Sequence, residues 1–192
     1  MNQNSNSLHL ALKEPSMEKR KDKVKQLIAN GADLNERNEQ FETPLHVAIS
    51  LGLDEIAAEL IPKMRLGCNY LHLAIRMDRP QIIELMIKFG FNINAKCNIG
   101  FTHLHYAIRF GTEIIVKILL ENGADFDTKF LELGLTPLMV AITFNRSSIV
   151  KILIEYGASL KKRNIKGMSP LEIALVQKKF DIAKMISQYE RN

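Results

Sequence analysis

The 192-residue sequence predicts an all-α protein built from stacked helix–turn–helix repeats. A short pattern, clearest as Thr-Pro-Leu-His-Val-Ala at 43–48, recurs with its alanine at positions 11, 48, 74, 107, 141 and 174. The last three steps between these alanines are 33, 34 and 33 residues, which is typical of a structural repeat. The clear copies also carry apolar residues at helical spacing and end in a glycine turn.

The fourth copy illustrates how one repeat forms its two helices. Thr102 is placed to cap a first helix with its hydroxyl, and Gly111 ends that helix. A second helix is predicted over 113–121, where apolar residues gather on one face, and the turn at 122–125 terminates it. Because one helix pair cannot bury its own apolar face, neighbouring pairs must stack. We therefore expect a single repeat domain over 8–192.

The remaining copies follow the same plan with two departures. The first copy predicts a helix over 8–12, a charged insertion over 13–23 and a second helical segment from Val24 to Ile28. The second copy has Pro62 where a glycine turn is expected, which predicts an interrupted helix and a shortened connection. Residues 1–7 are expected to be disordered. The approximate repeats are 8–37, 38–65, 66–98, 99–132, 133–165 and 166–192.

Composition describes an ordinary soluble, folded protein that we expect in the cytoplasm. Hydrophobic residues make up 46% and charged residues 24% of the chain, and no apolar run approaches the roughly 20 residues of a membrane helix. The polar start of the chain does not resemble a secretory signal. Cys68 and Cys97 are interpreted as reduced thiols, since two cysteines make no disulfide framework. The net charge of +5 slightly favours acidic partners.

The six copies resemble the ankyrin repeat family over almost the whole chain, from about residue 8 to about 190. The resemblance implies a solenoid of helix pairs with projecting β-hairpin-like loops, here called fingers, that lead into the first helix of each repeat. It implies that His46, His72 and His105 are structural and bond the threonine and backbone of the neighbouring turn. It also marks Asn35 as a position that asparaginyl hydroxylation could modify.

No pattern of catalytic, cofactor-binding or metal-ligating residues is present. The repeated histidines would lie about one repeat apart, whereas zinc ligands must converge on one ion. His103 occupies the position of proline in other copies, and we expect it to face solvent. Phosphate-loop, zinc-protease and nucleophile-elbow motifs are absent, so we expect no enzyme activity and no cofactor.

The resemblance implies that partners contact the fingers and the exposed end of each first helix. Read across the copies, these positions form an apolar row with flanking arginines, a composition typical of protein interfaces. We expect Phe101 and Leu135 to add exposed apolar area beside it. The alternative is that these side chains pad the base of each finger. The candidate partner-binding residues are Leu51, Arg76, Met77, Phe101, Arg109, Phe110, Leu135, Thr143 and Phe144.

Two basic clusters, at 19–23 and 161–166, are either solvated loops or docking sites for an acidic partner. Nucleic acid is a weaker candidate because no aromatic residues alternate with these charges. The favoured function is a monomeric module that binds another protein. Within it, the chain resembles either ankyrin effectors delivered into host cells by bacteria or viruses, or inhibitors that mask transcription factors. The interaction arm of a larger enzyme and a self-associating structural protein remain alternatives.

Overall fold

The computed structural model describes residues 7–64, 67–96, 100–130 and 132–191. Two compact units make up the chain, Met1–Phe91 and Asn92–Asn192. Over the described residues each unit consists of three helix pairs, and no β-strand is formed. The predicted all-α class is therefore confirmed. The expectation of one domain over 8–192 stays a prediction.

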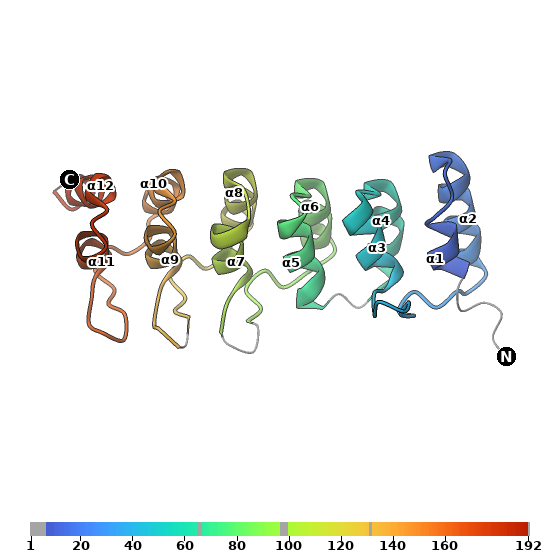
Figure 1. Ribbon diagram of the computed structural model, residues 1–192, viewed down its shortest axis with the longest axis horizontal. Coiled ribbons are helices and arrows are strands. Elements are labelled where there is room, and N and C mark those ends of the chain that lie inside the picture. The colour runs from blue at the N-terminus through green and yellow to red at the C-terminus, as the bar shows by residue number, and fades with distance from the viewer. Residues whose placement is uncertain (1–6, 65–66, 97–99, 131, 192) are drawn as a thin grey trace. The chain divides into compact units, whose positions relative to one another are not determined.

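The first unit pairs its helices in chain order, followed by a short 3-10 helix after the second pair. First helices lie beside first helices, with α3 against α1 and α5, while α4 contacts α2 and α6 (Figure 1). The bounds are α1 Ser7–Ala11, α2 Met17–Ala29, α3 Pro44–Leu51, α4 Asp54–Leu60, η1 Ile61–Lys63, α5 Cys68–Arg76 and α6 Pro80–Lys88.

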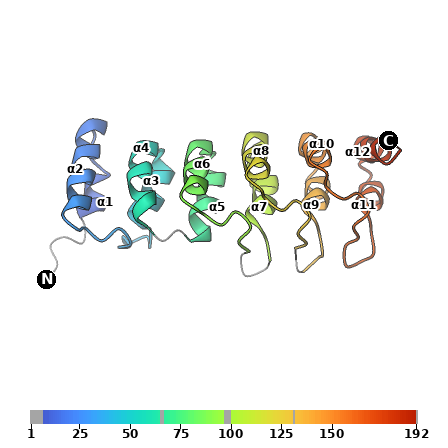
Figure 2. The ribbon, with the colours of Figure 1, turned by 180° about the vertical axis from the view of Figure 1, so that it is seen from behind.

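The second unit repeats this layering more regularly. Here α9 lies between α7 and α11, and α10 lies between α8 and α12. The fingers before α9 and α11 project from the first-helix layer, as both views of this unit show (Figures 1 and 2). Antiparallel bridges Lys96–Thr102 and Phe130–Leu135 give two fingers their hairpin character. The bounds are α7 His103–Phe110, α8 Glu113–Glu121, α9 Pro137–Thr143, α10 Ser147–Glu155, α11 Pro170–Val176 and α12 Phe180–Tyr189.

The repeated pattern builds the first helix and its packing in the same way in several copies. The hydroxyls of Thr43, Thr102, Thr136 and Ser169 each accept a backbone N–H three residues later, so each one caps a helix. The six repeated alanines are all 0% exposed. Their small side chains allow neighbouring first helices to approach closely, which explains why alanine recurs at this position.

The prediction of an insertion between the two helical segments at 13–23 is wrong for most of these residues. Helix α2 begins at Met17, with the Ser16 hydroxyl as its N-cap, and includes the basic residues at 19–23. No glycine or proline interrupts this segment, and ion pairs tie it to α4. Lys21 lies 2.7 Å from Glu55, and a second pair joins α2 to α4 one turn later. The first basic cluster is therefore part of a packed helix.

The departure at Pro62 is confirmed. Helix α4 ends at Leu60, the 3-10 helix follows, and α5 begins at Cys68 after a short connection. The expected disorder of residues 1–7 concerns positions outside the described residues, except Ser7, which begins α1. Cys97 also lies outside them.

Candidate functional site

The second unit brings three of the predicted partner-binding residues together in one cluster, here called the aromatic surface. Phe110 at the end of α7 is 48% exposed, and Phe144 just after α9 is 42% exposed. The Cζ of Arg109 lies 4.8 Å from the ring centroid of Phe110 and 5.0 Å from that of Phe144. A guanidinium at this distance from an aromatic face is attracted by the ring quadrupole, so Arg109 contacts rings from two neighbouring repeats.

A groove of about 190 Å³ includes two further predicted residues, Leu135 and Thr143. Two of its apolar walls are well exposed, Leu133 by 46% and Ile165 by 65%. The groove is formed by the last two fingers together with α9 and α11, the first helices that follow them. Its lining is Leu133, Leu135, Thr143, Asn164, Ile165, Lys166, Met168, Ile173 and Gln177.

The expectation that Phe101 and Leu135 add exposed apolar area is wrong, because both are half-buried. The ring of Phe101 packs edge-on against Phe130, with centroids 4.9 Å apart, and lies 5.2 Å from the ring of His105. Phe101 therefore fills the base of its finger. At this position the alternative, that such side chains pad the finger, describes the structure better.

The first unit carries the remaining predicted residues on α3 and at the end of α5, helices that contact each other. Leu51 is 58% exposed and Met77 36% exposed. Arg76 is exposed beside Met77. These three therefore present a smaller, aliphatic version of the surface seen in the second unit.

The repeated histidine links the N-cap residue of its own helix to the backbone of the next finger, as the resemblance implies. In the fourth repeat the Thr102 N–H donates to Nδ1 of His105 (3.3 Å), so Nδ1 is an acceptor. Nε2–H then donates to the Leu135 carbonyl in the following finger (3.3 Å). His9 makes the equivalent bond to the Glu42 carbonyl (3.0 Å). Burial lowers the pKa of His105 to about 4, so it is neutral at pH 7.

His103 does not face solvent, contrary to the sequence-based expectation. It is 0% exposed, and its Nδ1–H donates to the carbonyl of Ile93 (3.0 Å). At this position of the repeat, both the imidazole ring of His103 and the proline ring of other copies are buried against the preceding chain. An imidazole there can also bond a backbone carbonyl, which proline cannot.

Sequence reasoning missed a set of cations that join successive repeats. Arg146 donates to the carbonyls of Ile108 (3.2 Å) and Gly111 (2.9 Å), at the end of the preceding first helix. Lys179 binds the end of α9 in the same way, through the Thr143 carbonyl (2.6 Å) and that of the residue before it. The signal was available, because both residues stand five positions after a repeat alanine.

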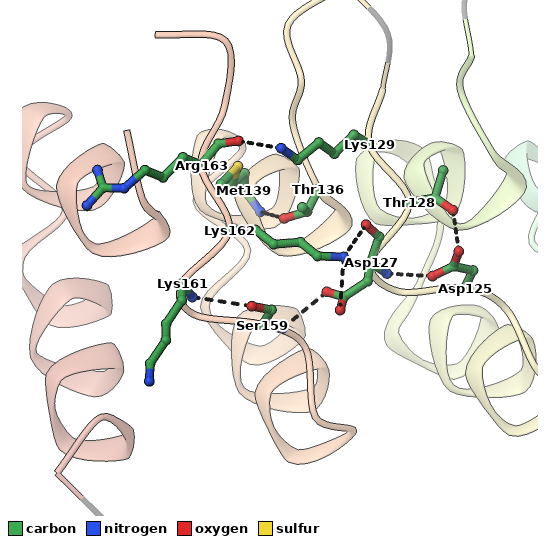
Figure 3. A network of polar contacts seen from close by, with 10 residues as sticks. All are labelled: Asp125, Asp127, Thr128, Lys129, Thr136, Met139, Ser159, Lys161, Lys162 and Arg163. Carbon is green, nitrogen blue, oxygen red and sulfur yellow. Dashed lines mark hydrogen bonds and ion pairs between the residues drawn. The ribbon is translucent and has the colours of Figure 1, made fainter. Parts of the chain in front are cut away.

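The basic cluster at 161–166 is partly engaged in joining the last two fingers (Figure 3). Lys162 pairs with Asp127 at 3.1 Å, and Lys129 donates from the other finger to the Arg163 carbonyl at 2.7 Å. Lys161 extends away from these contacts (Figure 3) and, like Lys166, is exposed. The cluster is therefore neither a purely solvated loop nor a fully free charge patch.

Two features are absent from the part of the chain that the structure describes. Its His, Cys, Asp and Glu side chains form no group of three or more that could hold a metal ion. None of its helices is both long enough and apolar enough to cross a membrane.

Comparison with known proteins agrees with the repeat structure. The family model for ankyrin repeats matches residues 8–97, 62–130 and 104–192. A solved structure, the ankyrin repeat domain of Bcl-3, described as a unique member of the IkappaB protein family, superposes with a TM-score of 0.83. That match has 25% identity and covers 95% of this chain and 85% of that one. No curated protein matches the sequence.

The match to the Bcl-3 domain confirms the predicted ankyrin fold. Ankyrin repeats indicate a protein–protein interaction module, and this fold is a typical non-enzymatic scaffold. With the family model covering residues 8–192 in overlapping segments, this chain belongs to the ankyrin repeat family.

Proposed function

We propose that this chain captures a protein partner through its aromatic surface and the adjoining groove, without a catalytic step. The observation that carries the proposal is the arrangement of Arg109, whose guanidinium stands over two aromatic rings that are each nearly half exposed. Side chains that only padded the fingers would pack against them, as half-buried Phe101 packs against Phe130. Aromatic residues and arginine are the residue types enriched where binding energy concentrates.

The packing of this surface also lowers the cost of binding. Arg109 is held by two rings and Phe110 by contact with Tyr106, whose ring centroid lies 4.7 Å away. Side chains that are already ordered lose little conformational entropy when a partner docks. The groove of about 190 Å³ beside Leu135 and Thr143 would receive an apolar side chain of the partner. In the first unit, Leu51, Arg76 and Met77 would make the corresponding contacts.

The decisive test replaces both rings of the aromatic surface. The Phe110→Asp, Phe144→Asp double variant should weaken capture of the principal partner about tenfold or more, because truncating two binding hot spots is costly. Partners would be isolated from a lysate, identified by mass spectrometry and remeasured with the purified protein by calorimetry. The melting temperature should fall only slightly, because each side chain is nearly half exposed.

The matched control places two aspartates on second helices, away from the aromatic surface. Ile114 and Phe180 are 63% and 66% exposed, so Ile114→Asp, Phe180→Asp changes charge and apolar exposure to a similar degree. This variant should keep the partner. Equal affinity of the wild-type protein and the Phe110, Phe144 variant would refute the assignment of the surface.

Two versions of this function remain, both for a monomer acting in the cytosol of a cell. One is an effector directed at a host protein, which the Asn-, Lys- and Ile-rich composition weakly favours. The other masks a transcription factor, and the likeness to the ankyrin domain of Bcl-3, a member of the IkappaB protein family, favours this candidate. The identity of the captured partner decides between them, because only the second version requires a transcription factor.

A further inference from the structure

The finger of the second repeat and the finger of the last repeat contain the same turn. In one, the Asn38 side-chain oxygen accepts the N–H groups two and four residues later (3.0 and 2.9 Å). In the other, the Asn164 side chain does the same at 2.9 Å for both. The Phe41 N–H donates to the Asn38 carbonyl (2.9 Å), as the Gly167 N–H donates to that of Asn164 (3.0 Å). Phe41 therefore stands at a glycine position.

The conformation of this position explains why the fourth, fifth and sixth copies use glycine. Phe41 has φ of 61°. Three of the glycines seven residues before a repeat alanine, Gly100, Gly134 and Gly167, have φ of 76°, 61° and 73°, whereas Gly67 of the third copy has φ of −88°. This left-handed region suits glycine, whereas a bulky residue in it is a genuine outlier. The second repeat holds phenylalanine at a conformational cost that its sister fingers avoid.

Burial does not offset this cost. Phe41 is 76% exposed, more than Phe110 or Phe144 in the aromatic surface. A ring this exposed adds little packing to the fold that glycine would not provide. Strain of this kind gathers at positions that contact other molecules. The ring is therefore best explained by contact with a partner.

The charges around Phe41 identify the chemistry of that partner. Residues 33–42 carry four carboxylates, at Asp33, Glu36, Glu39 and Glu42, against the single guanidinium of Arg37. The corresponding residues of the last finger, 159–168, carry four cations and no carboxylate. An aromatic face beside carboxylates favours a guanidinium or ammonium group, which gains a cation–π contact and an ion pair together.

A groove adjoins this finger and could hold an extended segment of a partner protein. Its volume is about 370 Å³, and Gln40 and Glu42 on either side of Phe41 both line it. The base of the finger is held in place, because His9 donates to the Glu42 carbonyl (3.0 Å). Exposed Leu10 provides an apolar wall, and Lys13 is the cation among the lining residues. The full lining is His9, Leu10, Lys13, Asn38, Glu39, Gln40, Glu42 and Val47.

We propose that residues 33–42 form a second binding site, distinct from the aromatic surface, for a basic segment of a protein. An arginine or lysine side chain of that segment lies on the ring of Phe41 while the carboxylates of Glu39 and Glu42 pair with it and its neighbours. This site does not depend on the proposed function of the second unit, since none of its residues belongs to that unit.

A titration of the full chain with a short peptide of alternating arginine and glycine tests the proposal. Amide shifts in NMR spectra should change saturably at 38–42 and at Leu10. The Phe41→Gly variant should bind the peptide at least about threefold more weakly, since an exposed cation–π contact contributes on that scale. Its melting temperature should rise, because glycine relieves the left-handed strain.

Matched variants separate the ring from general effects. Phe41→Leu keeps apolar bulk but loses the π face, and it should also bind more weakly. Phe89→Leu removes another exposed aromatic of the same unit, 47% exposed, and should leave binding unchanged. Glu39→Gln should weaken binding and reduce its dependence on salt.

Three outcomes would overturn the proposal. Equal peptide affinity of Phe41→Gly and the wild type would remove the ring from the site. Equally tight binding of a peptide of alternating glutamate and glycine would remove the charge argument. A fall in the melting temperature of Phe41→Gly would mean that the ring packs structurally, and the strain would then need no partner to explain it.

Discussion

At the scale of single residues, His105 shows how a repeat position becomes a fixed neutral group. Its Nδ1 lies 2.8 Å from the Thr102 hydroxyl and accepts the Thr102 N–H, while Nε2–H donates to the next finger. Burial lowers its pKa to about 4, although the bond to the Leu135 carbonyl favours the charged form. The geometry needs the neutral ring, because a protonated Nδ1 could no longer accept the Thr102 N–H.

This arrangement predicts a specific dependence of stability on pH. The unfolded histidine titrates near pH 6.5 and the folded one near 4, so only the unfolded chain gains this proton between those values. The contribution of neutral His105 to the free energy of unfolding is fully present above pH 6.5 and is lost as the pH falls from 6.5 to 4. The total loss is about 3 kcal/mol, and it does not grow further below pH 4. Chemical denaturation of wild type and His105→Gln across this range checks it. Parallel curves for the two proteins would contradict the assignment.

At the scale of elements, a cation at the start of a second helix binds the end of the preceding first helix. Arg146 and Lys179 donate to carbonyls that α7 and α9 leave without helical partners. Arg79 takes the equivalent place over Gly52, where an added Cβ would collide with the guanidinium. A positive charge also complements the negative end of the helix dipole. The contact thus joins two repeats and caps one helix.

Removing this contact should destabilise the second unit measurably. Arg146→Met keeps most of the side-chain length but leaves the carbonyls of Ile108 and Gly111 without their charged donor. The free energy of unfolding should fall by about 2 kcal/mol, the scale of hydrogen bonds to charged groups. Lys117→Met, an exposed cation on α8, should change it by less than about 0.5 kcal/mol. Denaturant melts of both variants test the difference, and equal losses would mean that Arg146 acts only as surface charge.

At the scale of the whole molecule, the spacing of the repeated alanines predicts most of the fold but fewer of the residues in the candidate sites. It places the helices of the fourth repeat at their observed bounds and brings Arg109, Phe110 and Phe144 into one cluster. It fails for His103, whose carbonyl partner at Ile93 lies outside the repeated pattern. It also passes over Phe41, because an exposed side chain leaves no trace in apolar periodicity, although glycine at the equivalent positions was visible.

The last prediction concerns how much chain a stable fold requires. Residues 92–192 hold three helix pairs whose buried side chains contact neighbours within that unit, for example Leu119, Leu153 and Ile186, each 0% exposed. Because repeats are stabilised by their nearest neighbours, about three of them suffice for independent folding. A fragment of residues 92–192 should therefore give a helical circular dichroism spectrum and one cooperative thermal transition. A fragment of 133–192, with two pairs, should melt broadly at a much lower temperature. If the longer fragment also melts without cooperativity, its core depends on residues before 92.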